Sequence, residues 1–300
     1  MRKKVCVVIN NWNGGNLLIE CVSSLFEKTK YDNFKVIIVD DASTDGSDKI
    51  VKKKFKNVKV IKLKKHGGAS VTRNIGIEYC LNREKADYVI FLDNDTRIED
   101  EHWISRLVSI MEEMEDLGVL APIISTPQFY QTYTKKKIEF VRYVPSACVI
   151  IKKDVFHKIG GFDTNFLFVG NEDPDFCNRA IAAGFKIGVT SVTRVFHNTS
   201  FRKRKSIFWS FICTYNYLRY ILLNLREKNL FEIFSLIAIR KNSSGNFSPS
   251  NLVIAPDWWK RIFFIPLAFI LNLRNFKEIL ILRRERKSFR FLNEKFKKIE

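Results

Sequence analysis

Two carboxylates close an apolar stretch in the sequence YVIFLDNDTRIED, at residues 88–100. Asp93 and Asp95 flank Asn94 at the point where a buried strand would end. A pair of acids at a strand end can hold a divalent cation, which would bridge the oxygens of a diphosphate and neutralise its charge as it leaves. Asn94 cannot ionise, which limits like-charge repulsion at the site. The spacing therefore predicts a metal site suited to a departing diphosphate.

Polar clusters also follow the three apolar runs that precede this one. They are NNWNGG, DDASTDGS and KKHGGASVTRN, which begin at residues 10, 40 and 64. Glycine permits tight loops, Asp and Asn tolerate them, and the N-terminus of a following helix offers free N–H groups to an anion. Each cluster alone is explained by ordinary turn and cap chemistry. Four in succession favour a nucleotide-type site, although the sequence holds neither G-x-G-x-x-G nor G-x-x-x-x-G-K-[ST].

The elements that must position these clusters alternate along the chain. Short β-branched runs predict strands at residues 4–9, 35–40, 58–63 and 88–93. Apolar residues at helical spacing predict helices between them, at 17–26, 45–55 and 69–83. This alternation implies right-handed crossovers and an α/β fold with a mainly parallel sheet flanked by helices. Ligands of such sheets bind beyond the carboxyl ends of the strands, where the four clusters fall.

The composition is that of a globular protein in a reducing compartment. The 300 residues are 46% hydrophobic and 28% charged, so the chain can bury a core. Six cysteines lie in apolar surroundings without a C-x-x-C pair, which is typical of buried thiols and not of a disulfide framework or a zinc site. Because the first residues pass straight into a strand-like run, we expect a cytosolic chain.

The net charge of +19 is concentrated in the last third of the chain. Residues 198–300 hold 21 Lys and Arg against 7 Asp and Glu, whereas residues 1–197 hold 30 against 25. Aromatic-rich apolar runs lie in the same basic region, at 206–225, 230–239 and 262–273. A membrane-spanning helix needs about 20 mainly apolar residues. The first run reaches that length only by including Arg219, the second is too short, and the third is short and broken by Pro266.

We interpret residues 201–300 as a basic, amphipathic helical region that lies at a membrane surface, where its basic residues meet anionic headgroups. An ordinary helical subdomain with solvated charges would explain the same pattern, and a single span at 206–225 is a further alternative. A nucleic-acid-binding protein would also explain the charge. The sequence shows no helix-turn-helix, zinc finger or single-strand-binding aromatic motif, so we expect no nucleic-acid partner.

Four segments of the sequence together resemble a known enzyme family. VDDASTDGS, GGASVTRNIGI, FLDNDT and PSACVIIKKDVFHKIGGFDTNFLFVGNEDPDFCNR, in this order, are similar to the inverting glycosyltransferases of family two, and within it to the rhamnosyltransferase-like branch. The resemblance covers residues 4–200 and implies the Rossmann-like GT-A fold over 1–200. It also implies a nucleotide-sugar-binding half at 1–97, an acceptor-binding half at 98–200, and Mn²⁺ or Mg²⁺ held by the strand-end acids.

The resemblance assigns the nucleoside end of the donor to the first two clusters. Asp40 and Asp41 match the acidic pair that contacts the uracil or thymine base and the ribose. Asn10 and Asn13 belong to the loop region that lines the same place.

The diphosphate end is assigned to the third and fourth clusters. Gly68 is expected to contact the donor, and Arg73 matches a basic residue expected near the base and the diphosphate. Asp93 and Asp95 match the D-x-D motif, with Asp95 as the direct metal ligand. His197 matches a histidine that completes the metal site in some members, whereas a lone histidine after an apolar strand is commonly structural.

The acceptor side is assigned to the sequence NEDPDF. Asp173 matches the catalytic base of the family, and Glu172 is expected to contact the acceptor or to orient the base. Without the resemblance, acids at the start of a helix would be explained by the helix macrodipole. Two departures affect the acceptor side: PSAC replaces a small-Gly-Ala sequence, and Pro174 replaces an aliphatic residue.

The sequence therefore predicts a metal-dependent inverting glycosyltransferase. It would move a sugar from a UDP- or dTDP-sugar to a hydroxyl of a saccharide or lipid-linked acceptor, at the cytoplasmic face of an anionic membrane. A sugar nucleotidyltransferase is the alternative enzyme, because it would share the nucleotide-binding sheet and the metal acids but would have no use for a base at Asp173.

Overall fold

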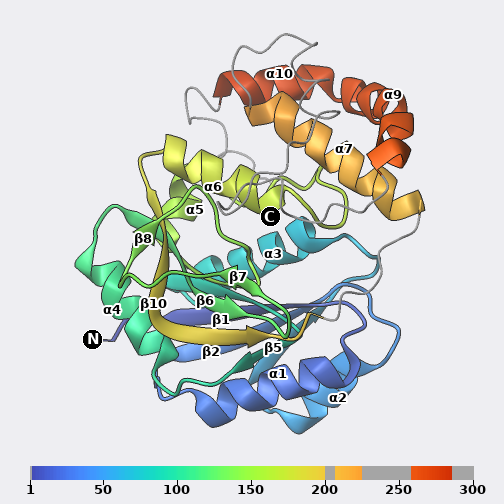
Figure 1. Cartoon of the computed structure of the whole chain (residues 1–300). Coiled ribbons are helices and arrows are strands. Elements are labelled where there is room, and N and C mark those ends of the chain that lie inside the picture. The colour runs from blue at the N-terminus through green and yellow to red at the C-terminus, as the bar shows by residue number, and fades with distance from the viewer. Residues whose placement is uncertain (1, 200–206, 225–257, 286–300) are drawn as a thin grey trace.

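The structure, a computed structural model, describes residues 2–199, 207–224 and 258–285 (Figure 1). The strands are β1 Val5–Asn11, β2 Phe34–Asp40, β3 Val58–Lys62, β4 Tyr88–Asp93, β5 Thr96–Ile98, β6 Leu117–Ser125, β7 Tyr130–Thr132, β8 Glu139–Phe140, β9 Cys148–Lys152 and β10 Lys186–His197. The helices are α1 Gly15–Lys28, α2 Ser47–Lys54, α3 Ala69–Glu78, α4 Trp103–Glu113, α5 Lys153–Ile159, α6 Glu172–Ala182, α7 Ile207–Asn224, α9 Trp258–Arg274 and α10 Phe276–Glu285, and a π-helical turn, Tyr79–Arg83, extends α3. The four strands and three helices predicted in the first hundred residues are confirmed.

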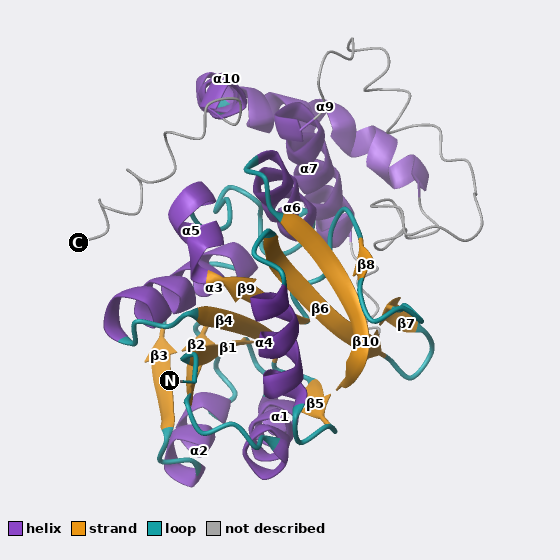
Figure 2. Cartoon of the chain, turned by 90° about the vertical axis from the view of Figure 1, so that its left-hand side faces the viewer, coloured by secondary structure: helices purple, strands orange, loops and turns teal. Residues whose placement is uncertain are grey.

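The strands form one 10-stranded mixed sheet (Figure 2). The main order is β3-β2-β1-β4-β9-β6-β10-β5, with β7 beside β6 and β8 beside β10. Strands β1 to β4 are parallel, but β9 runs antiparallel to both β4 and β6. Strand β10 pairs parallel with β6, so the prediction of a mainly parallel sheet is confirmed along the main order. In that order β9 and the short β5 run the other way, and β9 enters the sheet without a crossover helix before it.

Helices cover both faces of the sheet. Alternate residues of β1 show this: Val5, Val7 and Ile9 pack with α1 and α4, whereas Cys6 and Val8 pack with α3, α5 and α6. Burial on both faces explains why the strand reads as a continuous apolar run instead of an alternating one.

The parallel register aligns the polar ends of the first strands. Asn11 lies opposite Asp40 on β2, and Asn10 lies opposite Asp93 on β4. The clusters after β1, β2 and β4 therefore meet at one edge of the sheet, as the sequence predicts for carboxyl ends of parallel strands.

Helices α7, α9 and α10 form a separate layer over α6 (Figures 1 and 2). They share a small apolar core that also includes Phe166 of the preceding region. The helices predicted at 206–225 and 262–273 are confirmed as α7 and α9, and the run at 230–239 lies outside the described residues. The expected break at Pro266 is wrong, because α9 continues through Pro266, which removes one backbone donor without ending the helix. Among the helices in the described ranges, none has the length and apolar character needed to cross a membrane.

Replacing Gly76 by alanine tests the contact that seats α3 on the sheet. A Cβ at Gly76 would collide with Cγ1 of Val8 on β1, so we expect a loss of about 1–3 kcal/mol in the free energy of unfolding, measured in urea. The control Glu78→Ala, on the same helix, should change stability little. Val8→Ala removes the colliding methyl groups, so the double variant should lose less than the sum of the two single variants. Fully additive losses would show that the two residues are independent.

Candidate active site

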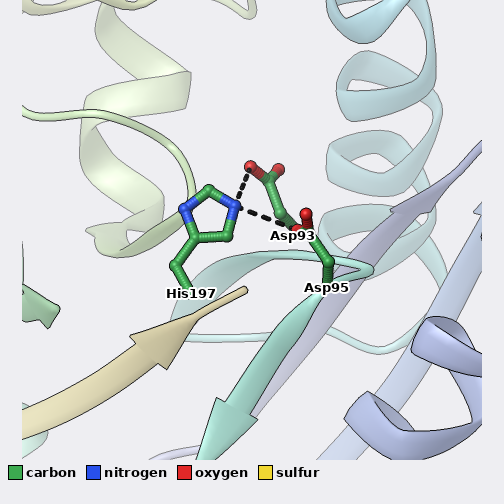
Figure 3. Close-up of side chains that lie close together, drawn as sticks. All are labelled: Asp93, Asp95 and His197. Carbon is green, nitrogen blue, oxygen red and sulfur yellow. Dashed lines mark ion pairs between the residues drawn. The ribbon is translucent and has the colours of Figure 1, made fainter. Parts of the chain in front are cut away.

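Asp93, Asp95 and His197 converge at the carboxyl edge of the sheet (Figure 3). The two acids come from the end of β4 and the turn after it. His197 is the last residue of β10, which pairs antiparallel with β5 and so places His197 opposite Thr96. Its Nε2 atom lies 2.9 Å from Asp95 Oδ1 and 3.6 Å from Asp93 Oδ2. The structure therefore brings together the three residues that the sequence assigned to the metal.

The surroundings of this triad suit a divalent cation. Gln131 Oε1, on β7, lies 2.8 Å from His197 Nδ1, which leaves Nε2 facing the two acids. A second hydrogen bond of this kind orients metal-binding histidines in general. Carboxylate oxygens and an imidazole nitrogen within 4.8 Å of one another are a donor set that Mn²⁺ or Mg²⁺ accepts.

The electrostatics of the triad reflect three ionisable groups in a small space. Burial raises the pKa of Asp93, and the charge of Asp95 adds to the rise while His197 opposes it. Burial alone would lower the pKa of His197, but the hydrogen bond to Asp95 and the charge of Asp93 raise it above its ordinary value. A positive charge between the acids is therefore favoured, which a metal ion could supply.

Arg73 joins α3 to the start of α6 through a buried ion pair. Its Nη1 atom lies 3.0 Å from Glu172 Oε1 and 3.2 Å from Asp173 Oδ1. Burial tends to lower the pKa of Arg73, but the charges of Asp173 and Glu172 outweigh it and raise the pKa. Burial raises the pKa of Glu172, and the charge of Asp173 adds to this. Arg73, expected near the base and the diphosphate, thus contacts Glu172 and Asp173, although its charge also acts on Asp93.

Ser146 fixes the carboxylate of Asp173. The Ser146 backbone N–H donates to Asp173 Oδ2 at 3.0 Å, and the Ser146 hydroxyl donates to Asp173 Oδ1. Ser146 belongs to the PSAC sequence that departs from the family pattern, so the departure itself supplies the partner. Together with the ion pair to Arg73, these bonds tie Asp173 to the loop before β9. The macrodipole explanation of the NEDPDF acids does not require such contacts.

Asp40 and Asp41, which the family resemblance assigns to the nucleoside, hold the loops that follow β1, β2 and β3. Asp40 is fully buried and accepts hydrogen bonds from Asn11 Nδ2 at 2.7 Å and from the Ser43 N–H at 3.0 Å. Asp41 accepts from the N–H groups of Gly67 at 2.6 Å and Gly68 at 2.8 Å. Both carboxylates therefore hold protein groups in this structure.

The remaining predicted residues border the same loops. Asn13 Oδ1 accepts a hydrogen bond from the Thr44 N–H at 2.9 Å, which joins the loops after β1 and β2. Asn10 Oδ1 is buried and has no hydrogen-bond partner among the residues that the structure describes. The His66 ring stacks between Trp12 and Phe168, with centroid distances of 4.5 and 4.9 Å. Gln131 and this aromatic stack were missed in the sequence, where no spacing or motif marks them, and Ser146 was noted only as part of the PSAC departure.

Solved structures with this fold are glycosyltransferases of the GT-A class. GalNAc-T7, crystallised with UDP, GalNAc and Mn²⁺, matches with a TM-score of 0.61 and 18% identity, covering 74% of this chain and 48% of that chain. S. aureus TarS 1-349, in complex with UDP-GlcNAc, matches with a TM-score of 0.56 and 21% identity, covering 75% of this chain and 68% of that chain. The expected GT-A fold is therefore confirmed.

The sequence profile named Glycosyl transferase family 2 matches residues 6–168, more than half of the chain. The chain belongs to this family. O-antigen biosynthesis protein RfbC of Myxococcus xanthus is 25% identical over 67% of this chain and 18% of RfbC. TarP of Staphylococcus aureus, a poly(ribitol-phosphate) beta-N-acetylglucosaminyltransferase, is 40% identical over 33% of this chain and 30% of TarP. The matched regions thus span less than a third of either relative.

The triad should bind Mn²⁺ together with a nucleoside diphosphate. We expect Asp95→Asn to abolish the Mn²⁺-dependent part of UDP binding in calorimetry, because one of the converging carboxylates is lost. Gln131→Leu should weaken Mn²⁺ binding about 10- to 100-fold, because His197 loses its orienting partner. Glu99→Gln, at an exposed acid directly after β5, is the control. Undiminished binding by folded Asp95→Asn would contradict the assignment.

Proposed function

We propose that the chain is a metal-dependent inverting glycosyltransferase. It transfers a sugar from a UDP- or dTDP-sugar to a hydroxyl of a saccharide or lipid-linked acceptor. The observation that carries this proposal is the presence of two separate acidic groups at one edge of the sheet. Asp93 and Asp95 face His197, whereas Asp173 is held by Arg73 and Ser146.

The proposed roles of the two halves of the chain follow from the positions of these acidic groups. Residues 1–97 would bind the donor through the loops of Asp40, Asp41 and Gly68, and residues 98–200 would bind the acceptor. Asp93, Asp95 and His197 would hold the Mn²⁺ or Mg²⁺ ion, which when bound neutralises charge on the departing diphosphate.

The proposed reaction is a single displacement. Asp173 takes the proton from the acceptor hydroxyl as that oxygen bonds to the anomeric carbon of the sugar. The bond from this carbon to the diphosphate oxygen breaks on the opposite face, so the anomeric configuration inverts and the nucleoside diphosphate leaves. Ser146 and Arg73 hold the Asp173 carboxylate in place, and Glu172 shares the charge of Arg73 at the acceptor side.

The comparisons support the substrate classes without identifying them for this chain. The TarS structure contains UDP-GlcNAc, the GalNAc-T7 structure contains UDP and Mn²⁺, and TarP is named for a poly(ribitol-phosphate) acceptor. These names favour a UDP-sugar among the donors to be tested first. They also add polyol phosphates to the acceptors worth testing.

Asp173→Asn should transfer almost no sugar while binding the donor normally. Removal of a general base typically slows a reaction about 100- to 10,000-fold, and Asp173 acts on the acceptor hydroxyl and not on the nucleotide. Nucleoside diphosphate release and the anomeric configuration of the product give the rate and the stereochemistry, while Mn²⁺-dependent UDP calorimetry gives donor-side binding. Asp154→Asn, at an exposed acid in the first turn of α5, controls for the loss of an acid. Near-normal turnover, or a product that retains the donor configuration, would show that the residue or the mechanism is wrong.

We further propose that the C-terminal helices bring the enzyme to the cytoplasmic face of an anionic membrane. Large apolar side chains are exposed on α9 and α10, at Leu267, Ile270, Leu273, Leu280 and Ile281. Arg274 and Lys277 are exposed between them. Apolar residues beside basic ones are the pattern by which helices bind the surface of anionic bilayers.

Co-sedimentation with vesicles tests this surface. Binding should increase with the fraction of anionic lipid and decrease with salt, since salt screens the attraction of basic residues. Ile270→Glu combined with Leu273→Glu should abolish binding, whereas Ile50→Glu, at an equally exposed position on α2, should not. A full-length protein that ignores anionic vesicles at low ionic strength would exclude this role for the basic region.

A further inference from the structure

Residues 162–171, here called the bridging segment, lead into the first turn of α6 and hence into Glu172 and Asp173. Their backbone is unusual: Phe168, Gly170 and Asn171 have positive φ angles of 53°, 119° and 67°. Residues with a side chain rarely adopt this conformation, and it persists only where the surrounding structure holds it. The contacts that hold the segment come from two sides.

Helix α7 is hydrogen-bonded to one side of the bridging segment through Asn216. The Asn216 side chain accepts a hydrogen bond from the Leu167 N–H at 2.8 Å and donates to the carbonyl oxygens of Leu167 at 2.8 Å and Val169 at 3.2 Å. Asn216 has no exposed surface. An amide buried in an apolar helix is unfavourable unless its hydrogen bonds are made, and here the bridging segment supplies the partners.

Arg219, one turn further along α7, forms an ion pair with the start of the segment. Its Nε and Nη2 atoms lie 3.1 and 2.8 Å from Asp163 Oδ2. Arg219 is fully buried and its guanidinium lies over the ring of Phe166. The arginine that shortens the apolar run in the sequence is thus directed inward, onto the segment that precedes the catalytic acids.

The other side of the bridging segment touches the donor-side loop. The Ala69 N–H donates to the carbonyl oxygen of Phe168 at 2.6 Å. A Cβ on Gly68 would lie 2.7 Å from Phe168 Cα, so the two backbones are in direct contact. The Phe168 ring is stacked on His66 and also makes edge contacts with the rings of Phe208 and Trp209 on α7. A shift of Phe168 would therefore displace the glycine loop that Asp41 holds.

We propose that Asn216 and Arg219 are positioning residues for sugar transfer, an inference that rests on the function proposed above. They fix the bridging segment in its strained conformation, and the segment in turn sets Asp173 on the acceptor side and the Gly68 loop on the donor side. Helix α7 is then part of the catalytic unit, although it lies beyond residue 200. Both residues act through the segment, because their buried side chains contact it directly.

Hydrogen exchange and turnover, measured on the same full-length variants, test this inference. In Asn216→Leu and Arg219→Met, amide exchange in residues 163–171 should accelerate, because the bonds that protect the segment are lost. Hydrolysis of UDP-GlcNAc with Mn²⁺, read as UDP release, should slow on the order of 10- to 100-fold, because misplacement of reacting groups has effects of this size. Asn216→Ser keeps a neutral hydroxyl that can make one of these hydrogen bonds, so it should lie between Asn216→Leu and the wild type in both measurements and serves if Asn216→Leu does not fold.

Tyr220→Phe is the matched control on α7. It removes the hydrogen bond from Asn178 on α6 but leaves the contacts of Asn216 and Arg219, so it should change neither exchange nor UDP release. Unchanged exchange in residues 163–171 of folded Asn216→Leu would overturn the inference. Faster exchange with unchanged UDP release would overturn it as well, provided that Asp173→Asn is inactive. If Asp173→Asn also releases UDP normally, the proposed function itself is wrong, and the positioning role for transfer is lost with it.

Discussion

The candidate site depends on one buried guanidinium. Arg73 lies between Glu172 and Asp173 and acts electrostatically on Asp93, so a single positive charge balances acids from two halves of the chain. Without it, carboxylates would be buried side by side without compensation, which is strongly unfavourable. Gly76 allows α3 to approach β1 closely, and this seats Arg73 one turn earlier on the same helix at the depth where it reaches both acids. The close packing of α3 on the sheet is therefore also a condition for the charge balance of the site.

The parts of the structure that follow from local pattern were predictable from the sequence. Strands β1 to β4 have β-branched runs, and their parallel register follows from the alternation with helices. Asp93 and Asp95 could be assigned because a strand end fixes their location. His197 could be added only through the family resemblance, since its neighbour Thr96 belongs to β5, which is three residues long and pairs with a strand about a hundred residues later.

The features of the structure that the sequence did not predict depend on contacts between distant residues. Strand β9 runs antiparallel between β4 and β6, and no local signal in CVIIK indicates its direction. In the sequence, Ser146 was notable only as a departure from the family pattern. Its hydrogen bond to Asp173 depends on the position of α6, which the sequence does not give. Arg219 was read for its effect on hydropathy, but its charge is satisfied by Asp163, which sequence spacing does not relate to it. In each case the partner is set by topology and not by periodicity.

The match to the family profile ends at residue 168, inside the bridging segment. A boundary drawn there from sequence similarity would separate Asp163 from Arg219 and Leu167 from Asn216, which are in direct contact. Recombination that exchanged C-terminal regions between relatives at this boundary would combine loops and helices that had not varied together. The two sides of the ion pair and of the amide contact should therefore be inherited as a unit, and the region after residue 168 should be as constrained in its inward-facing polar residues as the catalytic sheet is.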